Sequence, residues 1–309
     1  MVSSLGISAH DRGLRMSPWR VWALAARPRT LPAAAAPVAI GAGLAASRDG
    51  FAAGPALAAL IGALLIQIAT NLANDYYDYV RGGDTDDRVG PVRVTQAGLV
   101  SPGAVKRAML TVLLAALAVG VYLVSVGGWP IVWIGLASLV CAVAYTGGPF
   151  PLAYHGLGDL FVFVFFGLVA VGGTVWVQTL TFTPEALWAG AGIGALSTAI
   201  LVVNNLRDIP TDRIAGKNTL AVRLGVGGSR VEYVAMLLLG AAVPPVGVIV
   251  FGWPPAVWGA SAVVLAAGGS LRRVLRFEAP HDLLPALGGT ARVVALYGLV
   301  LGAALAWGP

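Results

Sequence analysis

Apolar residues dominate nine stretches of the chain, and each stretch is long enough to cross a bilayer as a helix. The nine stretches cover residues 20–46, 54–80, 104–125, 129–146, 158–178, 186–206, 229–250, 255–272 and 291–308. Lipid offers the backbone no hydrogen-bond partner, so helices are the expected form. Pro28, Pro32 and Pro37 fall inside the first stretch and are able to break it. The pattern predicts an all-α integral membrane protein with nine transmembrane helices.

Charged residues are scarce and unevenly placed. They make up 11% of the 309 residues, while 58% are hydrophobic; a soluble domain is about one quarter charged. If the N-terminus is cytoplasmic, 19 of the 20 Lys and Arg residues fall on the cytoplasmic side, and only Arg48 lies opposite. The positive-inside rule therefore predicts a multi-pass protein of the cell membrane with its N-terminus in the cytoplasm and its C-terminus outside. This placement argues against nucleic acid as a partner.

The same pattern predicts the domain organisation. Residues 1–19 are mixed and polar and form the expected cytoplasmic N-terminal segment, while residues 20–309 form a single transmembrane domain. Within that domain, none of the nine stretches carries a charged residue at its middle. Ion-coupled carriers usually place ionisable groups there. The transporter interpretation is therefore weakened, although a carrier of neutral solutes stays open.

Carboxylates gather at the cytoplasmic end of the second stretch. The segment NLANDYYDYVRGGDTDDRVGPVR (71–93) holds five of the fourteen Asp and Glu residues. Asn71, Asp75 and Asp78 are spaced at i, i+4 and i+7, which places them on one face of a helix. The spacing predicts a polar face that ends an otherwise apolar helix.

A similar segment ends the sixth stretch and reads NNLRDIPTDRIAGKNTLAVRLG (204–225). Asn205, Asp208 and Asp212 are spaced at i, i+3 and i+7, again on one helical face. Pro210 disfavours helical geometry at the preceding residue, so we expect Asp212 to open a new short helix. Each segment is followed by a loop rich in Gly and Arg. The two motifs, at 71–93 and 204–225, indicate a weak internal duplication.

Two carboxylate faces of this kind need cations, because like charges on a half-buried helix repel and lose hydration. Oxygen ligands without His or Cys suit Mg²⁺, which binds through a few carboxylates and substrate phosphates. Basic residues follow both motifs closely in the sequence and are able to neutralise diphosphate oxygens. They are Arg88, Arg93, Lys217 and Arg223. The alternative is that these acids are interfacial, solvated and paired with neighbouring arginines.

The motifs NDYYD (74–78) and DIPTD…GK (208–217) resemble the paired aspartate-rich motifs of the UbiA superfamily of intramembrane prenyltransferases. The resemblance implies a UbiA-like bundle of nine transmembrane helices with a cytoplasmic-side active site. Three segments, RPRTLPAAAAPVAIG (27–41), NDYYDYVRGGDTDDRVGPVRVTQAGLVSP (74–102) and YTGGPFPLAYHGLGD (145–159), are similar to the menaquinone branch. That branch transfers a polyprenyl group from polyprenyl diphosphate to 1,4-dihydroxy-2-naphthoate, with loss of CO₂ and diphosphate, and gives demethylmenaquinone.

The resemblance also implies roles for individual residues. The expected Mg²⁺ ligands are Asp75, Asp78, Asp84, Asp208 and Asp212. The expected diphosphate-binding residues are Asn71, Asn74, Arg88, Arg93, Asn205, Lys217 and Arg223. Tyr145 joins the four paired aspartates, Asp75, Asp78, Asp208 and Asp212, as a catalytic residue that can stabilise an allylic cation.

Two positions depart from the wider superfamily. Gly82 stands where a third Asp is usual, with Asp84 the nearest candidate, and Asp159 stands where Glu is more frequent. Two alternatives stay open at this point: a related enzyme with another aromatic acceptor such as 4-hydroxybenzoate, and a membrane carrier without catalytic activity.

Overall fold

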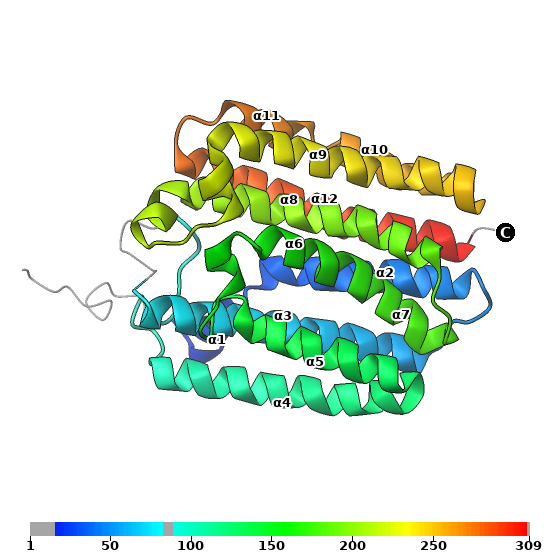
Figure 1. The fold of residues 1–309 in the computed structure, drawn as a ribbon, viewed down its shortest axis with the longest axis horizontal. Helices are drawn as coiled ribbons and strands as arrows, with labels where there is room; N and C mark the ends of the chain where they lie inside the picture. Colours follow the sequence, from blue (N-terminus) through cyan, green and yellow to red (C-terminus); the bar gives the residue numbers. More distant parts are fainter. Residues whose placement is uncertain (1–15, 83–88, 308–309) are drawn as a thin grey trace, which may run out of the picture.

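The structure is a computed structural model that describes residues 16–82 and 89–307, and within these ranges the regular elements are all helical (Figure 1). The α-helices are α1 (Pro18–Ala26), α2 (Leu31–Ala46), α3 (Ala53–Val80), α4 (Pro102–Gly127), α5 (Trp129–Ala144), α6 (Gly158–Phe163), α7 (Ala170–Thr179), α8 (Pro184–Ile214), α9 (Leu220–Phe251), α10 (Trp258–Leu265), α11 (Gly268–Arg276) and α12 (Leu284–Trp307). Short 3₁₀ turns cover Pro28–Thr30, Leu152–His155, Pro255–Val257 and Pro280–Leu283, and one π-helical turn covers Val164–Val169.

Six helical stretches among the described residues are long and apolar enough to cross a membrane. They are Ala53–Val80, Pro102–Gly127, Gly158–Thr179, Pro184–Ile214, Leu220–Phe251 and Pro280–Trp307. The apolar helix α5 is shorter, the first predicted stretch is divided between α1 and α2 at Pro28, and the eighth is divided between α10 and α11. The all-helical prediction is confirmed for the described residues, while nine spanning helices stay a prediction.

Helix α8 lies at the centre of the bundle. In its most apolar 18-residue window 72% of the residues are buried, compared with 11% in α4. Helix α8 packs against α9, α12 and the α6–α7 segment, while α2 pairs with α12 and α3 pairs with α4 (Figure 1). The polar motif at the end of α8 therefore starts from the most enclosed of these helices.

Small residues let α2 and α12 approach closely. A Cβ atom built on Gly302 would lie 2.5 Å from the carbonyl oxygen of Ala39, and one on Gly298 would lie 2.4 Å from the Cβ of Ala36. Small residues four apart are typical of helix contacts in membranes, where dispersion rather than the hydrophobic effect holds helices together. This contact fixes the first helices of the chain against the last one.

Helix α8 continues through Pro210 to Ile214, which corrects the expectation of a new helix at Asp212. Proline inside a helix removes one hydrogen bond and costs about 3 kcal/mol. Ile209 and Asp212 are both buried on either side of the proline, and the backbone amide of Lys217 donates to the carbonyl of Asp212 at 2.8 Å. Burial and this loop contact offset the cost of the proline.

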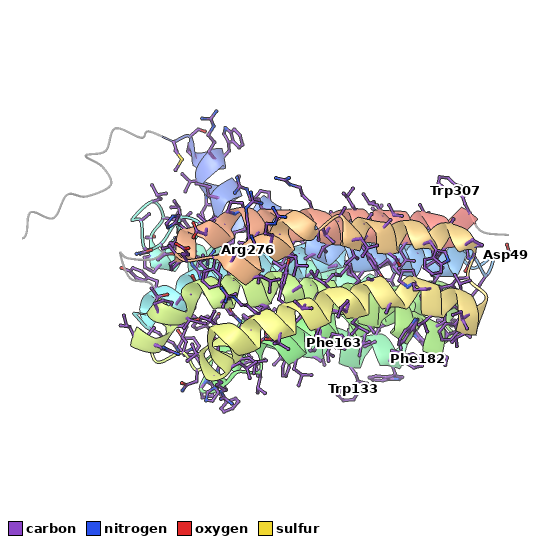
Figure 2. The ribbon with its side chains drawn as sticks, turned by 90° about the horizontal axis from the view of Figure 1, so that it is seen from above. Asp49, Trp133, Phe163, Phe182, Arg276 and Trp307 are labelled. Atoms are coloured by element: carbon purple, nitrogen blue, oxygen red, sulfur yellow. The ribbon has the colours of Figure 1, made fainter. Side chains whose placement is uncertain are left out.

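The two aspartate motifs lie at the same end of the bundle. Figure 2 places Asp49 and Trp307 at one end and Arg276 at the other. Because α3 begins just after Asp49, its last turns lie at the Arg276 end. Helices α3 and α8 have 28 and 31 residues, or about 42 and 46 Å, against a hydrocarbon thickness of about 30 Å. Their final turns can therefore stand at the water interface.

Candidate active site

A cavity of about 1010 Å³ runs between α2, α3, α5, the α6–α7 segment and α8. One part of its wall is polar and the rest is apolar. The cavity brings together the following predicted site residues: Asn71, Asn74, Asp78, Arg93, Tyr145, Asn205, Asp208, Asp212 and Lys217. Asp84 and Arg88 lie outside the described residues. Asp75 and Arg223 do not line the cavity.

Asp78 is the point where the two motif regions meet. Its Oδ1 is 2.9 Å from the ammonium nitrogen of Lys217, which follows α8, and Tyr154 donates its hydroxyl to the same oxygen at 3.1 Å. Its Oδ2 accepts from the Arg93 guanidinium at 2.9 Å. The Asp78 side chain is only 3% exposed. The cluster therefore places two cations around one carboxylate at the polar end of the cavity.

Asp75 was predicted to be a Mg²⁺ ligand, but in the structure its carboxylate binds backbone amides. Its two carboxylate oxygens accept the backbone amides of Val94 and Thr95, each at 3.0 Å. Asp75 is 1% exposed and lies outside the cavity lining. In this structure it anchors the segment that carries Arg93 to Asp78. Sequence spacing could not show this, because the anchoring amides come from another part of the chain.

Asn71 and Asn74 also hold neighbouring segments. The Asn71 amide donates to the carbonyl of Ala26 and to the Thr30 hydroxyl, both at 2.9 Å, and its oxygen accepts from Gln67 at 3.2 Å. The oxygen of Asn74 accepts from the Thr146 hydroxyl at 2.8 Å. These bonds tie α3 to the turn before α2 and to the segment after α5. They shape the polar wall of the cavity.

On α8, Asp208 has a partner that the sequence reasoning missed. Arg207 binds both oxygens of the Asp208 carboxylate, through Nε at 2.7 Å and a terminal nitrogen at 2.6 Å. Arg207 is 2% exposed, and it also donates to the Asn204 side chain at 2.9 Å. The sequence does show that Arg207 directly precedes Asp208, which is the one indication of this ion pair. Its orientation depends on the packing of α8 and was not predictable from spacing.

Asp212, Asn205 and Lys217 complete the α8 side. Asp212 and Asn205 are each 8% exposed and line the cavity. Lys217 reaches from the following loop to Asp78. The α8 motif, with Asp208 included, thus presents an amide and two carboxylates to the same cavity as Asp78.

Arg223 is placed away from the cavity, contrary to its predicted role at the diphosphate. Its guanidinium donates to the backbone carbonyls of Asn218 at 3.2 Å and His155 at 2.9 Å. Tyr154 donates its hydroxyl to Asp78, and Thr146, which the sequence pattern did not single out, donates its hydroxyl to Asn74.

The apolar part of the cavity is lined by aromatic and small residues. Phe161 and Phe165 line it with their rings stacked at a centroid distance of 5.9 Å, and Phe166 is also part of this wall. Tyr145 also lines the cavity. Tyr76 packs against Tyr77 and lies outside the cavity lining. The cavity therefore joins a charged end to an apolar interior.

Comparison with known proteins decides the family. The family model for the UbiA prenyltransferase family matches residues 34–286. The chain belongs to the UbiA prenyltransferase family. Together with the six candidate spans, this membership makes it a multi-pass membrane protein.

Relatives of this UbiA family member are similar along most of its length. The chain is 40% identical to a 1,4-dihydroxy-2-naphthoate octaprenyltransferase of Mycobacterium tuberculosis, over 95% of this chain and 99% of that protein. It is 43% identical to the Escherichia coli protein of the same name, over 74% and 76% of the two chains. A UbiA homolog from Archaeoglobus fulgidus, solved bound to GPP and Mg²⁺, has the same fold, with a TM-score of 0.66 at 13% identity over 92% of this chain and 99% of that one.

The donor set of this UbiA cavity suits Mg²⁺. The ligand atoms that suit Mg²⁺ in this cavity are oxygens. They are the carboxylate oxygens of Asp78, Asp208 and Asp212 and the amide oxygen of Asn205. Among the described residues, no three acids, His or Cys come close enough together to hold an ion by themselves. Mg²⁺ commonly binds through one or two carboxylates and substrate phosphates. The residues therefore fit a metal that arrives with a diphosphate.

Proposed function

We propose that this chain transfers a polyprenyl group from polyprenyl diphosphate to 1,4-dihydroxy-2-naphthoate, with release of CO₂ and diphosphate, to give demethylmenaquinone. The curated relatives that support the acceptor match the chain over most of its length at 40% and 43% identity. The observation that carries the proposal is the Asp78 cluster with Arg93 and Lys217 at the polar end of a large apolar cavity. That arrangement suits a ligand with an anionic head and a hydrocarbon tail.

The diphosphate head would lie beside Asp78, Asp208 and Asp212. Lys217 and Arg93 are the cations positioned to donate to its oxygens, and Asn205 adds an amide. Asp78, with Asp208 or Asp212, would hold Mg²⁺ together with the phosphates, and the ion would supply charge stabilisation of the leaving diphosphate. Asp75 acts as a positioning residue through the segment that carries Arg93.

The bond between the allylic carbon and the diphosphate oxygen breaks as negative charge develops on the leaving group. Lys217 and Arg93 stabilise that charge because they are already oriented in a buried site. The allylic cation then faces the apolar wall, where the rings of Phe161 and Tyr145 can stabilise it and water is excluded. The prenyl tail fills the space between α4, α5 and the α6–α7 segment.

The electron-rich ring of the acceptor completes the transfer. The ring carbon that bears the carboxyl group forms the new bond to the allylic carbon, and CO₂ leaves as the ring regains its electron pair. Tyr145 lines the cavity together with the carboxylates and the phenylalanine rings, so the acceptor ring would meet the cation beside it. No cofactor beyond Mg²⁺ is needed to balance the reaction.

We further propose that the polar end of the bundle faces the cytoplasm of a cell that carries this protein in its cell membrane. The N-terminus is then cytoplasmic, the C-terminus is outside, and nine segments cross the bilayer. The support is the distribution of 19 of the 20 Lys and Arg residues and the length of α3 and α8 beyond the hydrocarbon thickness. Cysteine labelling of Ser47→Cys and Asn218→Cys variants from either side of sealed vesicles would test this orientation.

A turnover assay tests the reaction itself. The protein in nanodiscs is given polyprenyl diphosphate and Mg²⁺ with either 1,4-dihydroxy-2-naphthoate or 4-hydroxybenzoate. Prenylated naphthoquinol with release of CO₂, lost when EDTA is added, is the expected result. Product with the benzoate alone would keep the metal-assisted transfer and overturn the acceptor. Folded protein that gives product with neither acceptor would favour a non-catalytic carrier.

A further inference from the structure

A second cavity of about 310 Å³ lies at the same end of the bundle. It is lined by Arg81 at the end of α3, by Tyr154 and His155, and by Asn218 and Arg223 near the start of α9. None of these residues lines the first cavity. The second cavity is therefore a separate hollow that no step of the proposed transfer uses.

Two guanidinium groups give this cavity its charge. Arg81 donates to the backbone carbonyls of Thr146 and Gly148, and Arg223 donates to those of Asn218 and His155. Within residues 16–82 and 89–307, neither guanidinium forms an ion pair with a carboxylate. Each guanidinium has five N–H donors, so donors remain after these bonds. Two arginines that pair with no carboxylate of the described residues produce a local field that attracts anions.

Local backbone geometry holds Arg223 in place. Gly156 has φ of +71°, and a Cβ atom built on it would lie 3.0 Å from Nε of Arg223 and 3.1 Å from Cζ. The backbone amide of Asn218 donates to the carbonyl of Tyr154 at 3.1 Å, which joins the two loops that form the walls. The site is thus pre-organised, which lowers the entropy lost when a ligand binds.

His155 adds a third polar group. Its Nδ1 lies 2.8 Å from the carbonyl oxygen of Pro151, so Nδ1 carries a hydrogen and donates. Its ring stacks on Phe150 at a centroid distance of 3.7 Å, which fixes the ring plane. Nε2 is then the nitrogen that can bind a ligand, and when protonated it is a further donor to an oxyanion.

We propose that this second cavity binds a phosphate-type oxyanion without a metal. Tyr154 connects it to the first cavity, because Tyr154 contributes to the wall of the second cavity while its hydroxyl donates to Asp78 at 3.1 Å. If the proposed function holds, diphosphate released beside Asp78 meets Arg81 and Arg223 on its way to water. The phosphate headgroup of a membrane lipid has the same chemistry.

The test measures binding of inorganic pyrophosphate to the detergent-solubilised protein in metal-free buffer, without prenyl substrate. Saturable binding that weakens with added salt is expected, because exposed charges are screened. Arg223→Gln and Arg81→Gln should each weaken it about tenfold or more. Arg213→Gln is the matched control, since Arg213 is exposed at the end of α8 and lines neither cavity.

A further variant, Asn218→Asp, tests the proposal even if the arginine variants fail to fold. Asn218→Asp keeps the backbone bonds of residue 218 and adds a negative charge to the cavity, so it should also weaken pyrophosphate binding about tenfold. Thermal melting of each variant checks that it is folded. No metal-free binding to the native protein, or binding unchanged in all three cavity variants, would overturn the proposal.

Nanodiscs distinguish the two sources of the anion. If phosphatidylglycerol nanodiscs abolish pyrophosphate binding that phosphatidylcholine nanodiscs retain, the resident anion is a lipid headgroup. Binding retained in both identifies free diphosphate. Asp208→Asn should leave this binding intact while it impairs Mg²⁺-dependent transfer, because Asp208 pairs with Arg207 and lines only the first cavity. The turnover assay therefore tests the proposed function, and the binding assay independently tests the second cavity.

Discussion

The polar motifs of α3 and α8 have similar spacing, yet the structure uses them differently. On α3, Asn71 and Asp75 are occupied by neighbouring backbone and side chains, and Asp78 joins the cations at the cavity. On α8, both Asp208 and Asp212 line the cavity together with Asn205. Similar spacing therefore does not produce a symmetric site.

The difference follows from what surrounds each helix. Helix α3 lies beside the turn before α2 and beside the segment that begins at Val89, and both present backbone groups that need partners. Helix α8 is enclosed by other helices, whose backbone groups are already satisfied within themselves. The α3 motif consequently builds the wall of the site, and the α8 motif supplies more of its ligands.

Asp78→Asn is expected to have the largest effect. The change removes a carboxylate that binds both Lys217 and Arg93, and it leaves these buried cations without that partner. Turnover should fall roughly 100- to 1000-fold, and the free energy of unfolding by about 3 kcal/mol. Steady-state kinetics and thermal unfolding in detergent measure both. Asp49→Asn, at the opposite end of the bundle, is the matched control and should change neither (Figure 2).

Asp75→Asn and Asp208→Asn test the comparison directly. In Asp75→Asn the new side chain would accept one backbone amide but oppose the other with its own NH₂ group, so the variant should lose about 2 kcal/mol of stability. Its Mg²⁺ concentration for half-maximal activity should stay near the native value. Asp208→Asn should raise that concentration about tenfold, because a neutral amide is a weaker ligand. An equal rise in both variants would mean that Asp75 is a metal ligand and that the two motifs act alike.

Asn71→Ala and Asn205→Ala compare the roles of two asparagines. Asn71 holds neighbouring segments in place, whereas Asn205 is proposed to contact the diphosphate. Asn71 makes three side-chain hydrogen bonds, so its loss should lower the free energy of unfolding by about 2 kcal/mol. Asn205→Ala should leave the melting temperature nearly native and reduce kcat/KM about tenfold. Melting curves and kinetics of the two proteins side by side provide the measurement. The reverse pattern would contradict the assignment.

Tyr154→Phe is expected to have the smallest effect. It removes one hydroxyl hydrogen bond to Asp78 while Lys217 and Arg93 keep their contacts. A loss of about 1 kcal/mol corresponds to a decrease of about fivefold in turnover. Tyr79→Phe is the control, because Tyr79 is 44% exposed on α3. A Tyr154→Phe protein as impaired as Asp78→Asn would mean that the hydroxyl acts on the substrate itself.

Much of the candidate site was predictable from spacing. The i, i+4 and i+7 pattern on α3 and the i, i+3 and i+7 pattern on α8 indicated one polar face on each helix, and Lys217 was expected near the carboxylates. The continuous α8 was not predictable, because the cost of Pro210 is local while the burial that offsets it comes from other helices. The same reason explains Arg223, whose backbone partners depend on how the loops before α9 pack.

Local sequence was enough to predict that this protein is helical and apolar, and at which ends of its helices the carboxylates lie. Those properties depend on residues close together in the chain. Tertiary structure alone decided that Asp78 faces Lys217 and Arg93, that Asp75 binds the amides of Val94 and Thr95, and that a second basic cavity exists. The physical reason is that each carboxylate takes whichever donors the folded chain brings within about 3 Å, and those donors come from distant segments.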